Sequence, residues 1–108
     1  MVDKFTEVAE VQLGSCSVVY RVHATQRMFE RDISDTDVWV VLRGGHVVEK
    51  YADDYPFPSF LVCGTSGDGR TLHVVAALDA STETIYIVTA YIPDAQKWAD
   101  NFTRRRKP

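Results

Sequence analysis

The chain has few cysteines and no long apolar run. Only Cys16 and Cys63 are present, without a C-x-x-C pair, so neither a disulfide framework nor a cysteine-rich zinc site is predicted. We expect both thiols to be reduced and buried. No apolar run approaches the roughly 20 residues that cross a bilayer, and acidic residues interrupt the stretch where a signal peptide would be apolar. The sequence therefore predicts a cytoplasmic protein without a membrane partner.

Charge is distributed unevenly along the chain. The net charge is -3, but the run from Arg104 to Lys107 holds four of the twelve basic residues. Residues 1–103 therefore carry 8 basic and 15 acidic residues, a net charge of -7. An acidic body argues against nonspecific capture of nucleic acid, although a local basic site is compatible with it. We interpret the terminal run as a solubilising tail that could reach a nucleic acid.

The length of 108 residues fits one domain, and 45% hydrophobic with 25% charged residues is an ordinary globular balance. We expect an N-terminal extension over residues 1–17, a folded core over 18–103 and a basic tail over 104–108. Residues 2–13 fit a short helix or an edge strand equally well. The sequence contains no internal repeat and no Gly-rich phosphate loop.

The first half of the expected core reads as a strand followed by two helices. Ser17 to Val22 is rich in β-branched and aromatic residues, and His23 to Arg31 is rich in helix formers. Ser34 and Asp37 have the spacing of a capping box, which predicts a second helix that ends near Gly44. The β-branched valines of this second segment leave a strand as the alternative.

The second half predicts an antiparallel meander and a last helix. The expected strands are His46 to Tyr51, Ser59 to Gly64, Thr71 to Leu78 and Ile85 to Tyr91. After Pro93, Asp94 can cap a helix with Trp98 and Phe102 on its apolar face. The predicted fold is α+β, with a four- to five-stranded antiparallel sheet packed by two N-terminal helices and one C-terminal helix.

Several segments resemble one bacterial family. The run His23-x-x-x-Arg27-Met28-x-Glu30-Arg31-x-Ile33-Ser34, then Leu72 to Val75, Ile85 to Asp94 and Trp98, are similar in order and spacing to the family called domain of unknown function 4258. The resemblance covers residues 20 to 106. It implies the architecture of RelE and ParE toxins, of which some cleave messenger RNA and others inhibit gyrase. The chain departs from these toxins in its acidic body and in the segment before the shared signature.

The predicted first helix carries a candidate anion site. His23, Arg27 and Arg31 are spaced by four residues and would form one stripe, from which two guanidinium groups could hold a phosphate. The alternative is a solvated face on which the arginines pair with Glu30 or Asp35.

His73 is the second candidate, because it lies in an otherwise apolar strand. With His23 it would supply the acid and the base for RNA cleavage by attack of the 2′-hydroxyl group. The alternative is a buried, hydrogen-bonded histidine of structural importance. We expect His23, Arg27, Arg31 and His73 to converge on one cleft between the first helix and the sheet.

Arg70 and Tyr91 are weaker candidates, Arg70 as a phosphate contact and Tyr91 as a phenolic donor or base stacker. A metal site from His23, His73 and Cys63 lacks any short ligand spacing, so we expect neither a metal nor another cofactor.

The leading interpretation is a RelE-like toxin-class domain acting as a metal-independent ribonuclease, with RNA and an antitoxin-like protein as partners. The alternative is a noncatalytic protein-binding module that uses the same sheet surface.

Overall fold

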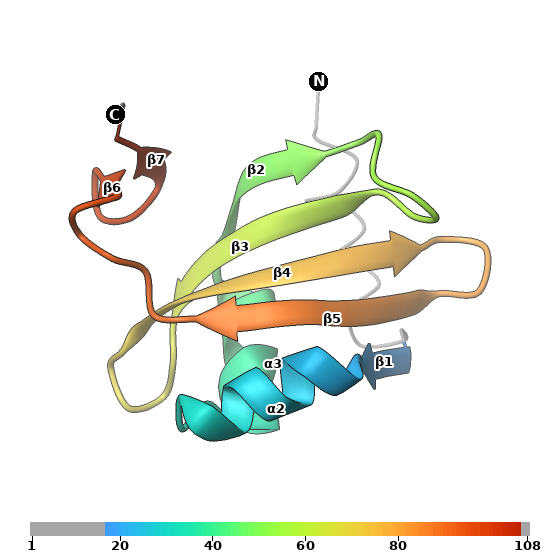
Figure 1. Cartoon of the computed structure of the whole chain (residues 1–108), viewed down its shortest axis with the longest axis horizontal. Coiled ribbons are helices and arrows are strands. Elements are labelled where there is room, and N and C mark those ends of the chain that lie inside the picture. The colour runs from blue at the N-terminus through green and yellow to red at the C-terminus, as the bar shows by residue number, and fades with distance from the viewer. Residues whose placement is uncertain (1–16, 107–108) are drawn as a thin grey trace.

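Residues 17–106 are described by a computed structural model, in which two helices cover one face of a five-stranded sheet (Figure 1). The sheet has the order β1-β5-β4-β3-β2. Its strands are β1 (Ser17–Tyr20), β2 (His46–Tyr51), β3 (Ser59–Thr65), β4 (Thr71–Asp79) and β5 (Thr84–Tyr91). The helices are α2 (Val22–Glu30) and α3 (Asp35–Gly44). A separate two-stranded hairpin, β6 (Trp98–Ala99) and β7 (Arg104–Arg105), follows β5.

The sheet is mixed, and the prediction of an antiparallel sheet is wrong. Strands β2 to β5 form the predicted meander, but β1 pairs with β5 in parallel, with Ser17 opposite Thr84 and Tyr20 opposite Ile87. Three hairpin reversals make β5 run opposite to β2, and β1 runs in the direction of β5. At the β2 edge, β1 would have been antiparallel to its neighbour. Whether the sheet is mixed or antiparallel therefore depends on which edge strand β1 joins. The residues of β1 and their neighbours in sequence do not specify that edge.

The two predicted N-terminal helices are present. The capping box at α3 is complete, because Asp37 N donates to Ser34 Oγ at 3.0 Å and Ser34 N donates to Asp37 Oδ2 at 3.0 Å. Val38, Val41 and Leu42 of this helix are buried. The cap and the helical spacing of the buried residues outweigh the low helix propensity of valine, so the strand alternative is wrong.

The hydrophobic core lies between the helices and one face of the sheet. Alternate residues of β3, β4 and β5 supply the sheet side of this core: Phe60, Val62, Leu72, Val74, Ala76, Leu78, Ile85, Ile87 and Ala90. The residues between them point to the opposite side. We call that side, which carries His73, Val75, Ala77 and Tyr86, the open face of the sheet.

The predicted C-terminal helix is absent from the described chain, which forms turns and the β6–β7 hairpin after Pro93. Asp94 does cap one turn, since Asp94 Oδ1 accepts from Gln96 N at 2.8 Å. The chain then reverses at Asp100, Asn101 and Phe102, whose φ angles of 53°, 57° and 68° are left-handed. A right-handed helix cannot continue through three consecutive residues with left-handed φ angles.

The hairpin also changes the interpretation of the basic terminal run. Arg104 and Arg105 are paired in β7 with Ala99 and Trp98 of β6 and do not form a separate tail.

The predicted extension up to Cys16 and the undecided segment 2–13 lie outside the described residues. Cys63 is buried, and burial raises the pKa of its thiol. Neither α2 nor α3, the helices of residues 17–106, is long and apolar enough to span a membrane.

The end of α3 offers a matched pair of substitutions. A methyl group on Gly45 would lie 2.5 Å from the Cys63 carbonyl oxygen and 2.6 Å from that of Val41, whereas one on Gly44 would meet nothing within 4 Å. We expect Gly45→Ala to lower the free energy of unfolding by about 1–3 kcal/mol, because backbone atoms must move. Gly44→Ala should raise it by up to about 1 kcal/mol through helix propensity. Urea denaturation measures both, and equal midpoints would contradict this close packing.

Candidate functional site

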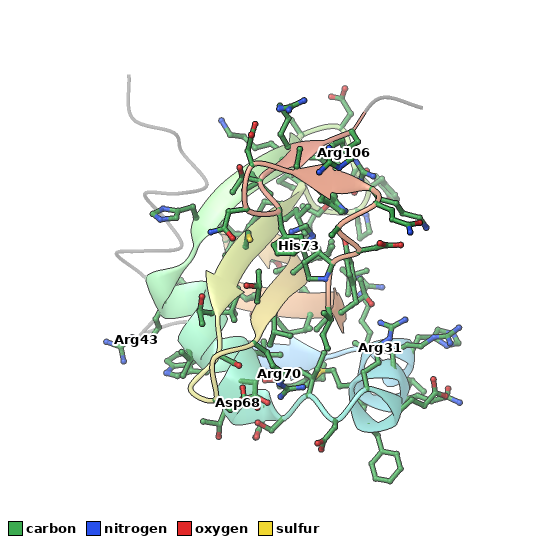
Figure 2. The ribbon with its side chains drawn as sticks, turned by 90° about the vertical axis from the view of Figure 1, so that its left-hand side faces the viewer. Arg31, Arg43, Asp68, Arg70, His73 and Arg106 are labelled. Atoms are coloured by element: carbon green, nitrogen blue, oxygen red, sulfur yellow. The ribbon has the colours of Figure 1, made fainter. Side chains whose placement is uncertain are left out.

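The candidate site is a pocket where the end of α2, the end of β5 and the C-terminal hairpin meet. Its volume is about 490 Å³, and it is lined by Arg31, Tyr91, Ile92, Asp94, Lys97, Trp98 and Arg105. We call it the Arg31 pocket. Figure 2 shows His73 on the sheet, between Arg31 at the end of α2 and Arg106 in the C-terminal segment. Three basic groups and two aromatic rings thus surround one acid.

Two of the basic groups, Arg31 and Lys97, are not paired with a carboxylate in the described chain. Arg31 follows the last residue of α2, and its Nη1 donates to the carbonyl oxygen of Ala90 at 2.8 Å. This bond fixes the partly buried guanidinium group at the pocket. Within residues 17–106, neither Arg31 nor Lys97 forms an ion pair. With these two cations in its lining, the pocket is suited to an anion.

The third basic group, Arg105, holds the wall of the pocket together. Its guanidinium carbon lies 4.6 Å from the ring centroid of Trp98, and its Nε and Nη2 donate to Glu49 at 2.8 and 3.2 Å. Tyr51 also donates its hydroxyl proton to Glu49. Burial raises the pKa of Glu49, but the hydrogen bonds from Tyr51 and Arg105 outweigh it, so this pKa lies below its ordinary value. The carboxylate on β2 therefore anchors β7.

His73 lies behind the pocket and is fully buried, with 0% of its surface exposed. Its Nε2 is 2.8 Å from the carbonyl oxygen of Phe102, which can only accept, so Nε2 carries a proton. In the neutral ring Nδ1 then accepts from the Tyr91 hydroxyl group at 3.2 Å. The ring meets Trp98 edge-on, with centroids 4.5 Å apart. Burial lowers the pKa of His73, so the neutral form prevails at neutral pH.

The structure brings together part of the predicted site. Arg31 and Tyr91 line the pocket, and His73 contacts Tyr91 from behind. His23 and Arg27 are exposed on α2 and do not line this pocket. Arg27 Nη1 lies 3.5 Å from Glu30 Oε2, the surface ion pair that we weighed as the alternative.

Arg70 has a different set of partners. Its Nε donates to Asp68 at 2.9 Å and its Nη2 to Asp37 at 2.9 Å, which joins the β3–β4 turn to the start of α3. These contacts match a structural ion pair better than a phosphate site. Within residues 17–106, no group of three or more His, Cys, Asp or Glu side chains is placed to hold a metal ion.

Sequence reasoning missed Asp94, Lys97, Trp98 and Arg105 as site residues. We assigned the stretch after Pro93 to a core helix and the terminal arginines to a tail. A usable signal existed, because basic and aromatic residues interleave over residues 97–106, which is a pattern of nucleic-acid binding segments. It was discounted once Trp98 and Phe102 were interpreted as one helix face.

The family model described as Domain of unknown function (DUF4258) matches residues 20–92, more than half of the chain. This confirms the inferred family resemblance over those residues. The description names no toxin. Neither a curated protein nor a solved structure matches the chain. The matched region includes Arg31 and Tyr91 but ends before Asp94, so the hairpin side of the Arg31 pocket lies outside it.

The buried imidazole predicts a pH dependence of stability. Because the folded pKa of His73 is below its unfolded value, the unfolded state binds more protons as the pH falls below about 6.5. The contribution of His73 to the free energy of unfolding is therefore fully present above that pH and declines below it. In His73→Gln the amide can still donate to Phe102 and accept from Tyr91 but cannot titrate. We expect the wild type to lose more stability than this variant between about pH 8 and about pH 5.5.

Chemical denaturation at several pH values measures this difference. Equal pH dependence of the free energy of unfolding in the two proteins would show that His73 does not titrate between the folded and unfolded states. The narrow pH range keeps the ordinary carboxyl groups ionised throughout.

Proposed function

Because the chain belongs to the DUF4258 family, we propose that it is a RelE/ParE-like, toxin-class domain that binds single-stranded RNA in the Arg31 pocket and cleaves it without a metal ion. The observation that carries the proposal is that Arg31 and Lys97, which form no ion pair in the described chain, line one pocket together with aromatic side chains. Phosphate charge and base contact are the two features by which proteins hold single strands.

The lining residues divide into phosphate contacts and base contacts. The fixed guanidinium group of Arg31 presents its remaining N–H groups to phosphate oxygens, and Lys97 adds a flexible ammonium group. Tyr91 and the exposed Ile92 supply apolar surface for a base. Trp98 is nearly buried and serves mainly as a wall. Arg105 is engaged by Glu49, so its charge contributes less to the attraction.

Cleavage would proceed by transesterification. The 2′-hydroxyl oxygen attacks phosphorus while its proton passes to the Asp94 carboxylate. The bond between phosphorus and the 5′-oxygen breaks, and Lys97 gives a proton to that oxygen, leaving a 2′,3′-cyclic phosphate. Both residues line the pocket, and the bond from Gln96 N holds the Asp94 carboxylate at its rim. This assignment has more support than a pair of histidines, since both ring nitrogens of His73 already have partners.

The alternative, a noncatalytic protein-binding module on the open face, has less support. The C-terminal hairpin lies over His73 at one end of that face, and the loop before β3 places Phe57 on Tyr86 at the other. A flat sheet surface is therefore not presented. An antitoxin-like protein remains the protein partner that the toxin class implies.

Arg31 and Arg27 provide a matched test, because each substitution removes one positive charge near the end of the same helix. We expect Arg31→Ala to weaken binding of fluorescein-labelled single-stranded RNA by about tenfold or more, since it removes a charged hydrogen-bond donor from the pocket. Arg27→Ala should change it by less than about threefold, because Arg27 is exposed and paired with Glu30. Fluorescence anisotropy at fixed salt gives both affinities.

Arg31→Lys and thermal melts control for the lost bond to Ala90. Equal weakening by Arg27→Ala and Arg31→Ala would mean that the attraction is diffuse and that the pocket is not the site.

Cleavage requires a separate test. Asp94→Asn should bind RNA at least as tightly as the wild type, because it removes a negative charge from the pocket, but cut it at least about a hundredfold more slowly, because a carboxamide cannot accept the proton. The wild-type rate should be the same with and without a chelator. Product analysis by gel electrophoresis checks both points. Binding without any cleavage by the wild type would instead favour a noncatalytic domain.

A further inference from the structure

A second pocket opens on the open face of the sheet, at the end opposite the Arg31 pocket. Its volume is about 200 Å³, and residues that line it include Arg21, Tyr55, Pro56, Phe57, Val75 and Val88. We propose that this Tyr55 pocket is a second RNA subsite, which stacks a nucleobase of the same single strand whose phosphate occupies the Arg31 pocket. The inference rests on the proposed function and extends it from a single phosphate contact to a multi-nucleotide ligand.

The aromatic side chains of the pocket form a platform suited to a base. Phe57 and Tyr86 are stacked, with ring centroids 5.6 Å apart and planes at 3°. Tyr55 lines the pocket and is 94% exposed. An exposed ring beside a fixed aromatic pair can stack a base of any sequence, because every base has a π face.

One guanidinium group lies beside the aromatic rings of this pocket. The guanidinium carbon of Arg21 lies 5.6 Å from the ring centroid of Tyr86. In the described part of the chain, Arg21 has no carboxylate partner. Asp54 also lines the pocket and keeps its negative charge, with its carboxylate accepting the hydroxyl proton of buried Ser59. An aromatic platform with one unpaired guanidinium group offers a base contact and a phosphate contact together.

The register of the sheet sets the distance between the two pockets. On β4, His73 lies opposite Tyr91 of the Arg31 pocket, and Ala77, which lines the Tyr55 pocket, lies opposite Tyr86. Four residues of strand separate these two rows, a span of about 13 Å along one face. A few nucleotides of extended single strand can bridge this span, which is within the reach of one small RNA-binding domain.

The test compares short and long ligands, using fluorescein-labelled 2′-O-methyl oligouridines that cannot be cleaved. The wild type should bind a hexanucleotide about tenfold more tightly than a dinucleotide, because only the longer ligand reaches both pockets. Tyr55→Ala should remove this gain and leave the dinucleotide affinity unchanged. Phe29→Ala is the control, since Phe29 is also highly exposed, at 88%, but lies on α2. It should change neither affinity.

Each other outcome overturns the inference in a distinguishable way. If the hexanucleotide gains nothing over the dinucleotide, or if its affinity is insensitive to Tyr55→Ala, the second subsite is wrong while the Arg31 pocket stands. If the Tyr55 pocket binds a protein partner instead of RNA, Tyr55→Ala would leave the hexanucleotide affinity unchanged. Equal losses for both lengths would mean that Tyr55 supports the first pocket. No binding of either length by the wild type would overturn the proposed function and this subsite with it.

Discussion

The hydrogen bond from His73 Nε2 to the Phe102 carbonyl oxygen connects the sheet to the C-terminal hairpin. It is buried, and a buried donor that lost this partner would remain unsatisfied, at a cost of about 1–3 kcal/mol. The same ring holds the Tyr91 hydroxyl group through Nδ1 and contacts the edge of Trp98. One imidazole thus positions two walls of the Arg31 pocket. A histidine that is structural in its contacts therefore shapes the candidate site.

The contrast between Arg27 and Arg31 shows how an acidic chain can form a local cationic site. The two residues are one helical turn apart, yet Arg27 pairs with Glu30, whereas Arg31 bonds to a backbone carbonyl group. A carbonyl group orients the guanidinium group without cancelling its charge. Carboxylates pair with Arg70, which lies away from this pocket, and with Arg105 in the pocket wall. Arg31 thereby keeps an unpaired positive charge where the hairpin meets the end of β5.

The sequence predicted those parts of the fold that depend on neighbouring residues. The bounds of β2 match the prediction, those of β3, β4 and β5 differ by about a residue, and the Ser34 capping box is present, because hairpin turns and caps are local. The partner of β1 is a distant strand, so it could not be predicted. The segment after Pro93 has helical apolar spacing, but left-handed residues and the contact of Phe102 with His73 decide its structure. The prediction of the site was wrong for the same reason, since four of the seven lining residues come from this segment.

The parallel pairing of β1 with β5 also constrains how the chain is made. Ser17 lies opposite Thr84, so β1 leaves the ribosome long before its partner is synthesised. The hairpins of β2 to β4 can assemble in that interval, since they are sequential neighbours. Until β5 is made, the backbone N–H and C=O groups of β1 lack their strand partner. Helix α2, which packs on β5, also lacks its packing surface until then. The sheet can thus be completed only after β5 has been synthesised, so slow translation of that region would prolong the period in which the edge of β1 is open to aggregation.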